Sequence, residues 1–226
     1  MPLIIILAES ALELIPEEIR NDVLFKKKSK KGRYTSQLLD TALHSSMMKK
    51  LAFPKKRGRP DIVHLCLLNA LGSPLNKVNQ LRLFIHTINN EIFEINPDIR
   101  IPRNYNRFKG LMAKLLDDGE INTEDIQLIT KFKGSIDSLI QDFPNPEIYL
   151  LSSKGREIDI VESLFSDDSG KNYIIIIGGF QKGHFSDDLL SLSSSKNLIS
   201  ISPHSLDAWV VISKIINLYE LKLKIL

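Results

Sequence analysis

Short hydrophobic runs alternate along the chain with longer segments whose apolar positions recur at helical spacing. Four runs rich in isoleucine and leucine are typical of strands buried on both faces of a parallel sheet: Leu3–Ala8, Ile148–Ser152, Tyr173–Gly178 and Leu198–Ser202. The helical pattern marks Ser36–Leu51, Asp61–Leu71, Asn104–Leu116, Thr123–Gln141, Glu157–Phe165 and a final helix from about Ser205 to Lys224. This alternation predicts an α/β domain.

A β-hairpin is predicted in the middle of the chain. Gln80–Ile88 and Glu91–Ile95 are separated by Asn89 and Asn90, two turn residues that tolerate positive φ. We expect this hairpin to be an insertion beside the parallel sheet.

The final helix is apolar around nearly its whole circumference, with Trp209, Ile212, Ile215 and Leu218 among its apolar residues. A helix with one solvated face would show a narrower apolar stripe. The helix is therefore either central to the fold or one side of a subunit interface, and we expect a homodimer.

Composition narrows the class of protein. The 226 residues are 43% hydrophobic and 25% charged, which is typical of one folded domain and excludes a disordered or fibrous chain. Cys66 is the single cysteine, so no internal disulfide forms. No stretch approaches the roughly 20 apolar residues that span a bilayer, and acidic residues follow the short apolar run at the start. We therefore expect a cytoplasmic protein without a membrane partner.

Basic charge is concentrated in the first half. Residues 1–110 carry 19 Lys and Arg against 10 Asp and Glu, whereas the remainder carries 11 against 17. The densest runs are Lys26–Arg33 and Lys55–Pro60. Such a field attracts polyanions by counterion release, which favours nucleic acid as the partner. For Lys26–Arg33 taken alone, a solvated loop is an equally good interpretation.

Three segments with small residues at the ends of predicted strands are candidate ligand loops. They read LLSSKG (Leu150–Gly155), IIGGFQKGHF (Ile176–Phe185) and NLISISPHSLDAW (Asn197–Trp209). Ligands bind at the carboxyl ends of strands in open α/β sheets, where glycines let backbone amides approach closely. A tight turn would also explain the glycines, and helix capping would explain Ser202 and Ser205. Three loops of this kind predict a cofactor cradle.

Other chemistry finds little support. The five histidines are scattered, and no cysteine or histidine cluster has metal-ligand spacing, so we predict no metal. His64 and His86 fit structural roles better than ligand roles. Neither a G-x-S-x-G elbow nor a phosphate-binding G-x-x-x-x-G-K-[ST] loop is present in the sequence.

Two polar motifs stand out in the basic half. RGRPDIVH places Arg59 and Asp61 around a proline where a helix begins, so the two side chains can pair. RIPRNYNRF sets Arg100, Arg103 and Arg107 at spacings of three and four. With a helix from Asn104 and its lead-in held close, the three guanidiniums would share one face, which suits phosphates and flipped bases. Alternatively, Asp61 is only an acidic residue at the start of a helix, and the three arginines only form a solvent-exposed face.

These motifs resemble one known family. ALELIPEEI, LLDTALHSSMMKKL, RGRPDIVHLCLLNALGSPLNK, NPDIRIPRNYNRFKGLM, IIGGFQKG and the final SLDAW helix together resemble the ribosome-biogenesis rRNA pseudouridine N1-methyltransferases, in the archaeal form. These enzymes are called nucleolar essential protein in eukaryotes. The resemblance covers almost the whole chain, and RPD with IPRxxxRF is its most specific part.

The resemblance implies a SPOUT-type, Rossmann-like parallel sheet with a trefoil knot near the carboxyl end, a homodimer formed through the C-terminal helix region, and S-adenosylmethionine as cofactor. It implies one domain over residues 1–226, with a basic RNA-binding extension within about 52–110. The matching cofactor positions are Leu151, Ser152, Gly178, Gly183, Ile199, Ser200, Ile201, Ser202, Pro203, His204, Ser205 and Leu206.

The resemblance also implies a substrate, a pseudouridine in small-subunit rRNA that is methylated on ring nitrogen 1, with Arg59, Arg100, Arg103 and Arg107 contacting RNA. Arg59 would stabilise negative charge on the ring. Asp61 would either orient Arg59 or take the proton, and we favour orientation because an arginine-paired carboxylate is a weaker base. Two alternatives stay open: a non-catalytic rRNA-binding assembly factor, and a methyltransferase that acts on another RNA. Ribosome-assembly proteins are further expected partners.

Overall fold

The computed structural model describes residues 1–20, 37–158, 164–165, 170–192 and 197–225. Its helices are α1 (Glu17–Arg20), α3 (Thr41–Met48), the short 3-10 helix η1 (Pro54–Lys56), α4 (Pro60–Gly72), α5 (Pro74–Lys77), α6 (Tyr105–Asp118), α7 (Ile136–Gln141), α9 (Asp187–Ser191) and α10 (Ala208–Leu223). Its strands are β1 (Leu3–Ser10), β2 (Leu81–Thr87), β3 (Ile92–Ile95), β4 (Glu120–Asn122), β5 (Gln127–Phe132), β6 (Pro146–Glu157), β7 (Asn172–Gly178) and β8 (Leu198–Ser200).

The strands form one sheet in the order β4-β5-β3-β2-β1-β7-β6-β8. Five neighbouring strands of this sheet, β2, β1, β7, β6 and β8, pair in parallel. The other three, β3, β5 and β4, extend the sheet in antiparallel fashion. The α/β class and all four strands predicted from continuous hydrophobic runs are confirmed. Parallel strands covered on both faces require such runs, and every residue of β1 is buried.

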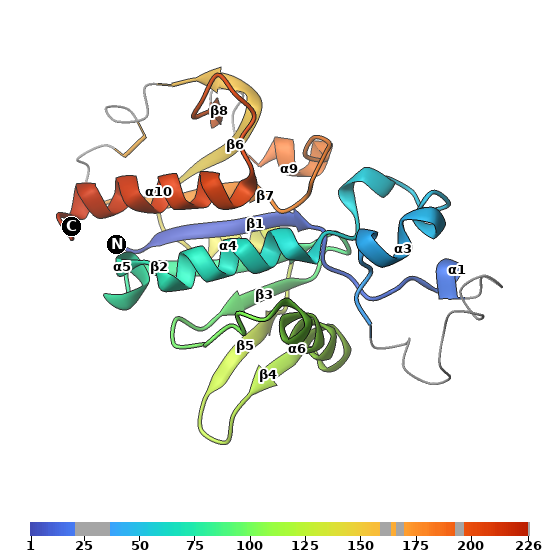
Figure 1. The fold of residues 1–226 in the computed structure, drawn as a ribbon. Helices are drawn as coiled ribbons and strands as arrows, with labels where there is room; N and C mark the ends of the chain where they lie inside the picture. Colours follow the sequence, from blue (N-terminus) through green and yellow to red (C-terminus); the bar gives the residue numbers. More distant parts are fainter. Residues whose placement is uncertain (21–36, 159–163, 166–169, 193–196, 226) are drawn as a thin grey trace.

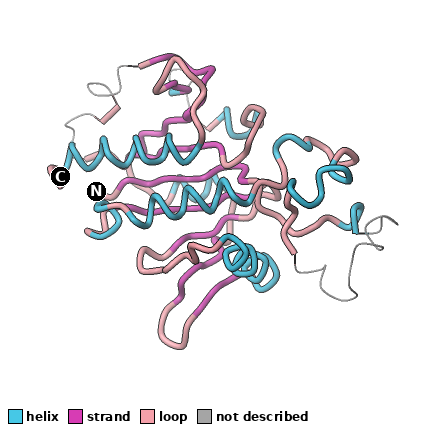
Figure 2. Tube along the Cα trace, viewed as in Figure 1, coloured by secondary structure: helices cyan, strands magenta, loops and turns pink. Residues whose placement is uncertain are grey.

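Helices cover both faces of the sheet, with α4 and α10 packed side by side across one face (Figures 1 and 2). Alternate residues of β1 serve the two faces. Leu3 and Ile5 pack into the core shared with α4, α6 and α10, whereas Ile4 and Ile6 pack into the core shared with α7 and α9. The period-2 geometry of a strand thus divides one hydrophobic run between two cores.

The predicted hairpin is β2 and β3, which pair in antiparallel register from Leu83–Ile95 to His86–Ile92. Asn90 has a φ of 60° in the turn, as the sequence predicts. The hairpin is continuous with the parallel sheet, because β2 also pairs with β1 in parallel.

The prediction of one helix over Thr123–Gln141 is wrong in its first part. Gln127–Phe132 forms β5 between β3 and β4, and the helix α7 starts only at Ile136 after its N-cap Ser135. Ile129 of β5 is fully buried. The segment therefore forms a strand, despite the helical spacing of its apolar residues, because it pairs with strands on both sides.

The other helix predictions differ at their ends. The helix predicted over Ser36–Leu51 is α3 and begins at Thr41. The Asp40 side chain accepts a hydrogen bond from the backbone N–H of Ala42 and caps the helix there. Glu157 belongs to β6, and most of the helix predicted to follow it lies outside the described residues, as does the run Lys26–Arg33. Within the described part of the chain, no helix is long and apolar enough to span a membrane.

The last helix, α10, is central to the fold. Ile212, Ile215 and Tyr219 are buried against α4 and the sheet. The buried Glu220 accepts a hydrogen bond through Oε1 from the backbone N–H of Leu75, at 2.8 Å, and so joins α10 to the start of α5. This packing accounts for much of the apolar circumference that the sequence shows.

Candidate functional site

A cleft of about 420 Å³ opens at the carboxyl edge of the parallel sheet. It is lined by residues of the three candidate segments that follow or end β6, β7 and β8, together with the start of α10. One detail differs from the prediction. LLSSKG is not a loop, because β6 continues to Glu157 and shifts its pairing with β8 between Leu151 and Arg156.

Ten of the twelve cofactor positions proposed from the sequence line this cleft. They are Leu151, Ser152, Gly178, Gly183, Ser200, Ile201, Ser202, His204, Ser205 and Leu206. Ile199 and Pro203 are not in the lining. Ile199 is fully buried, and its backbone lies so close to Gly155 that a Cβ there would be 2.5 Å from the Ile199 carbonyl carbon. Ile199 therefore packs against β6 and does not face the cleft.

The loop after β7 needs two of its glycines. A Cβ on Gly179 would lie 2.8 Å from the Ser10 Cα, because the loop passes directly against the end of β1. Its amide donates to the Ala8 carbonyl at 2.8 Å, and its carbonyl accepts from the Ala11 amide at 2.9 Å. Gly183 has a φ of 135°, where side chains are strained. These glycines bring backbone close to the cleft.

Sequence reasoning singled out the right segments but missed several lining residues within them. Phe180, Lys182, His184, Asp207 and Trp209 also line the cleft. The signal was available, because each lies in the glycine-rich loop or in Asn197–Trp209. The choice among them could not be made from the sequence, since side-chain direction in an irregular loop is set by packing.

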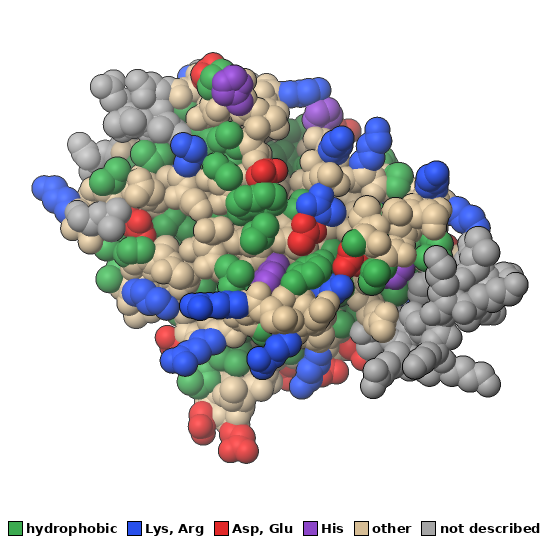
Figure 3. Space-filling model, viewed as in Figure 1, with side chains coloured by type: hydrophobic (Ala, Val, Ile, Leu, Met, Phe, Trp, Pro, Cys, Tyr) green, Lys and Arg blue, Asp and Glu red, His purple; other side chains and the backbone are tan. Residues whose placement is uncertain are grey.

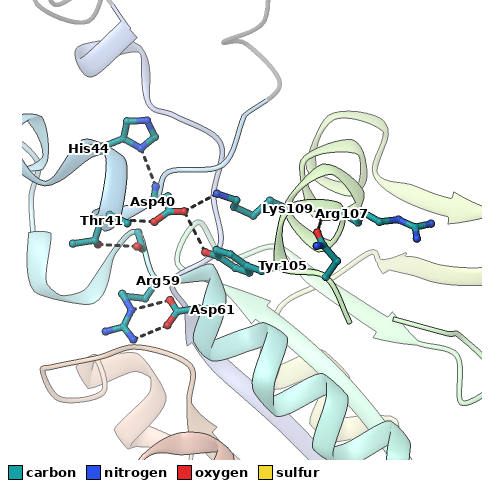
Figure 4. Close-up of polar contacts among 11 residues, drawn as sticks. Asp40, Thr41, His44, Arg59, Asp61, Tyr105, Arg107 and Lys109 are labelled. Atoms are coloured by element: carbon teal, nitrogen blue, oxygen red, sulfur yellow. Dashed lines mark hydrogen bonds and ion pairs between the residues drawn. The ribbon is translucent and has the colours of Figure 1, made fainter. Parts of the chain in front are cut away.

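Arg59 and Asp61 form a two-pronged ion pair at the start of α4 (Figure 4). Arg59 Nε and Nη2 donate to the two carboxylate oxygens of Asp61 at 2.8 and 2.6 Å. The hydrogen bonds that Arg59 donates to Asp61 raise the pKa of Arg59 above its usual value, so the guanidinium stays charged. Arg59 also lines the cleft. The structure thus brings the basic motif to the strand-end loops.

The turn that carries Arg59 is fastened on several sides. The Thr41 backbone N–H and Oγ1 both donate to the Gly58 carbonyl, at 2.8 and 2.7 Å. Gly58 has a φ of 67° and no room for a Cβ, which would lie 2.7 Å from the Met48 Cε. Lys56 Nζ donates to the buried Glu9 at 2.6 Å and lies 4.7 Å from the centre of the Phe180 ring. The position of Arg59 is therefore fixed before any ligand binds.

Asp40 joins α3 to α6 beside this turn (Figure 4). Besides capping α3, its carboxylate accepts from Lys109 Nζ at 2.9 Å and from the Tyr105 hydroxyl at 3.3 Å. The Asp40 backbone N–H donates to Nδ1 of the buried His44 at 3.0 Å. Burial lowers the pKa of His44, although the Asp40 charge opposes that effect. Neutral His44 is the form that can accept this hydrogen bond.

Arg100, Arg103 and Arg107 are exposed and make no ion pair with the described residues. Only Arg107 belongs to α6, since Asn104 is its N-cap. Figure 4 shows the Arg107 side chain pointing away from Tyr105 and Lys109. Residues i and i+2 of a helix lie on different faces, and that geometry separates Arg107 from Tyr105.

His64 has the structural role that the sequence favours. Its Nε2 lies 2.7 Å from the Pro102 carbonyl, and its ring stacks 4.3 Å from the Phe108 ring. These contacts tie the segment before α6 to α4. His86 is also structural, because its Nδ1 accepts from the Glu9 backbone N–H at 3.2 Å. Among the described residues, no group of three or more His, Cys, Asp or Glu side chains is placed to hold a metal ion.

The cleft suits a cofactor of moderate size. Its volume lies within the usual range of roughly 300–1,000 Å³ for small-molecule sites. Its lining offers close backbone at glycines, serine hydroxyls and apolar side chains such as Leu206 and Trp209. These groups can hold a small molecule through backbone hydrogen bonds, hydroxyl groups and apolar contacts.

Comparison with known proteins identifies relatives over nearly the full chain. The sequence profile described as EMG1/NEP1 methyltransferase matches residues 5–220. A "Ribosomal RNA small subunit methyltransferase Nep1" from Methanothrix thermoacetophila is 41% identical over 217 residues, covering 95% of this chain and 94% of its own. The protein of the same name from Staphylothermus marinus is 42% identical over 219 residues, with the same coverage.

A solved structure supports the same relationship. The crystal structure of Archaeoglobus fulgidus Nep1 bound to S-adenosylhomocysteine matches this fold with a TM-score of 0.85 at 34% sequence identity. The match covers 97% of this chain and 98% of that one.

Proposed function

Because this chain belongs to the EMG1/NEP1 methyltransferase family, we propose that it transfers the methyl group of S-adenosylmethionine to small-subunit ribosomal RNA, and that ring nitrogen 1 of a pseudouridine accepts it. The relatives are named as small-subunit rRNA methyltransferases, and the similar solved structure holds S-adenosylhomocysteine, which is what S-adenosylmethionine becomes after methyl transfer. The position of Arg59 carries the proposal, because one cleft contains both the strand-end loops and a fixed guanidinium.

The cofactor occupies the cleft between the ends of β6, β7 and β8 in this proposal. When bound, S-adenosylmethionine supplies an electrophilic methyl group on a cationic sulphur. Backbone groups near Gly178 and Gly183 hold it, with hydroxyls of Ser152, Ser200 and Ser202 and the side chain of Leu206. Ile199 and Pro203 act indirectly, by shaping the loops.

Arg59 acts on the acceptor base. The ring nitrogen carries a weakly acidic proton, and removing it places negative charge on the ring carbonyls. A charged guanidinium held by Asp61 stabilises that charge without having to reorganise. Holding the acceptor in line with the methyl group lowers the barrier further, since orientation can contribute ~7–11 kcal/mol.

Asp61 is a positioning residue in this mechanism. Both of its carboxylate oxygens already accept hydrogen bonds from Arg59, so the pair is arranged for orientation more than for proton removal. With no strong base required, the nitrogen proton leaves to solvent. Asp207 is an exposed carboxylate that lines the cleft, and its charge contributes to the raised pKa of Arg59.

The exposed arginines Arg100, Arg103 and Arg107 bind RNA phosphates in this proposal. Exposed guanidiniums without carboxylate partners release counterions when they meet a polyanion. They lie on the lead-in to α6 and on α6 itself, which His64 and Asp40 hold against α4 and α3. The arginines thus extend the RNA surface outward from Arg59.

The wider organisation follows the family. We propose one domain over residues 1–226 with a basic RNA-binding part within about 52–110, a trefoil knot near the carboxyl end, and a homodimer through the α10 region. Leu221 on α10 is 56% exposed, which leaves apolar surface for a second copy. Cytoplasmic rRNA and ribosome-assembly proteins are the proposed partners.

The test is transfer of a labelled methyl group from S-adenosylmethionine to two matched rRNA hairpins. One hairpin carries pseudouridine at the loop position and the other carries uridine. Label is expected only in the pseudouridine hairpin, and Arg59→Ala should strongly reduce its rate of incorporation. Arg82→Ala is the matched control, because Arg82 also pairs with a carboxylate, Glu94, but lies on β2 outside the cleft.

Two results would redirect the proposal. Label in both hairpins would retain the methyltransferase and remove the pseudouridine specificity. Label in neither hairpin, with tight and salt-sensitive RNA binding retained, would favour the rRNA-binding assembly factor. Light scattering of the purified protein would test the dimer separately.

A further inference from the structure

A second hollow adjoins the cofactor cleft. It has a volume of about 260 Å³ and lies between α3, η1 with the residue after it, and the loop that follows β7. Gln181 and Lys182 line both hollows, so the two lie next to each other. We call this hollow the basic groove, because Lys49, Lys55, Arg57 and Lys182 line it and none of the described residues in its lining is Asp or Glu.

The charges of the basic groove are available to a ligand. Arg57 is paired with Glu13, but Lys49, Lys55 and Lys182 are exposed and make no ion pair within the described part of the chain. Lys and Arg side chains gather over α3 and the segment after it in Figure 3. Three unpaired ammonium groups at one hollow produce a local positive field that favours a polyanion.

An exposed aromatic side chain stands at the same place. Phe53 is the N-cap of η1, directly before the groove residues Pro54 and Lys55, and is 76% exposed. Its φ and ψ are both 50°, a left-handed conformation that is rare for a bulky residue. None of the hydrophobic clusters formed by the described residues contains Phe53.

The strained backbone at Phe53 is held by its neighbours. The Lys56 amide donates to the Phe53 carbonyl at 2.9 Å, Leu51 is buried in the small core with α3, and Lys56 is anchored to Glu9. Strained residues that are fixed in this way concentrate at functional sites. The ring is therefore presented to solvent on a rigid support.

We propose that the basic groove binds the single-stranded RNA that flanks the methyl-acceptor nucleotide, with phosphates on Lys49, Lys55 and Lys182 and one unpaired base stacked on Phe53. The inference rests on the proposed rRNA substrate and deepens it. It assigns a second RNA contact, made by residues other than the arginines of the α6 segment.

RNA fits these features better than an acidic protein segment does. Unpaired bases stack on exposed aromatic rings, and a basic groove tracks the backbone of a single strand. The acceptor base must enter the cleft that the groove adjoins, so the adjoining nucleotides are already held nearby at high effective concentration. An acidic peptide would have the lysines but no comparable use for the ring.

The test compares two pseudouridine hairpins in the presence of S-adenosylhomocysteine. One has a minimal loop, and the other has several extra unpaired nucleotides on both sides of the target. The wild-type protein is expected to bind the extended loop more tightly. Phe53→Ala should weaken only the extended RNA, by about 5- to 150-fold, as expected for loss of one stacked base. Phe53→Trp should retain the wild-type affinity.

The lysines are tested by the salt dependence of binding. Each phosphate contact of a single strand contributes ~0.7 to the slope of log affinity against log salt. Lys49→Ala with Lys55→Ala should therefore reduce the slope for the extended RNA by about 1.4. The matched control is Lys77→Ala with Lys133→Ala, two exposed lysines on α5 and after β5 that line neither hollow.

Folding and function are separated by two further readings. Phe53→Gly suits the left-handed backbone, so it should fold normally and still lose the affinity gain of the extended loop. Methylation of the minimal hairpin tests the proposed function on its own. If the wild-type protein methylates it but gains nothing from the extended loop, or if the groove variants match the control, the groove proposal is wrong. The proposal would also be wrong if the groove variants lost binding to a poly-glutamate probe but kept the wild-type affinity for the extended RNA.

Discussion

The two RNA-facing parts of this molecule are built in opposite ways. Arg59 is fastened to Asp61 on a turn that Gly58, Lys56 and Thr41 hold rigidly, and it lines the cofactor cleft. Arg107, with Arg100 and Arg103 on the lead-in to α6, is exposed and makes no ion pair with the described residues. The fixed arginine suits chemistry, where geometry must be set beforehand, whereas the free arginines suit a flexible polyanion.

The largest expected effect is at the fixed pair. Arg59→Ala should lower kcat by about 10²–10³-fold, the usual cost of removing a group that stabilises developing charge. Asp61→Ala should lower kcat and RNA affinity together, because an unpaired Arg59 loses its orientation. Both are measured by single-turnover methyl transfer and by RNA binding.

The role of Asp61 is decided by which quantity changes. If Asp61→Ala binds RNA normally and cannot turn over, Asp61 is the base and the orienting role is wrong. Asp61→Asn refines the result, since an amide can accept one hydrogen bond from Arg59 but cannot take a proton at neutral pH. Retained turnover in Asp61→Asn would support orientation.

The next effect concerns the stability of the cleft. Gly179→Ala places a Cβ 2.3 Å from Ser10 Oγ and 2.8 Å from its Cα, so β1 or the loop must move. We expect a loss of about 1–3 kcal/mol in the free energy of unfolding, as for other overpacked sites. Weaker binding of S-adenosylhomocysteine should accompany it.

Gly110→Ala is the matched control for that variant. Gly110 lies in α6 with nothing within 4 Å of an added Cβ, so alanine should stabilise the helix by about 0.5–1 kcal/mol. Urea unfolding of both variants checks the pair. Equal stability changes would show that the close approach at Gly179 does not constrain the fold.

The cofactor cleft and the Arg59–Asp61 pair can both be predicted from the sequence. Continuous hydrophobic runs identify the parallel strands, and the carboxyl edge of such a sheet is a general ligand site, so the amino-acid sequence alone is enough to place the cleft. The Arg59–Asp61 pair is predictable because the two residues lie two positions apart on either side of a proline that begins a helix. In each case a short-range rule is enough.

Long-range packing decides what the sequence does not reveal. Spacings of three and four among Arg100, Arg103 and Arg107 do not reveal that His64 holds the lead-in to α6 through Pro102. Gln127–Phe132 is a strand because β3 and β4 flank it. Neither outcome is encoded in local periodicity.

A comparison within α6 sharpens the contrast between fixed and free cations. Lys109 pairs with the buried Asp40 at 2.9 Å, whereas Arg107, two residues earlier, points away (Figure 4). Lys109→Met should destabilise the fold by about 1–3 kcal/mol, because it removes a partner from a buried acceptor. Arg107→Ala should leave stability unchanged and reduce the salt slope of RNA binding by about 0.7.

The two variants form a crossed test. Thermal unfolding should separate them in one direction, and the salt dependence of RNA affinity should separate them in the other. A fall in stability for Arg107→Ala, or an unchanged salt slope, would show that Arg107 has a structural partner and would remove it from the RNA surface.

The smallest expected effect is a pH dependence that belongs to the fixed region. Burial lowers the pKa of His44 below its ordinary value, so the native state disfavours protonation relative to the unfolded chain. The unfolded state then binds more protons, and stability should fall as the pH drops below about 6.5. Protonation would also end acceptance of the Asp40 backbone hydrogen bond at Nδ1.

His44→Asn isolates this contribution, because an amide oxygen can accept from the same backbone N–H and does not titrate. Urea unfolding at pH 7.5 and 5.5 should show a smaller loss of stability on acidification for His44→Asn than for the wild type. His204→Asn, at an exposed position in the cofactor cleft, should keep the wild-type loss. If His44→Asn also keeps the wild-type loss, protonation of His44 is not the cause of the fall in stability at low pH.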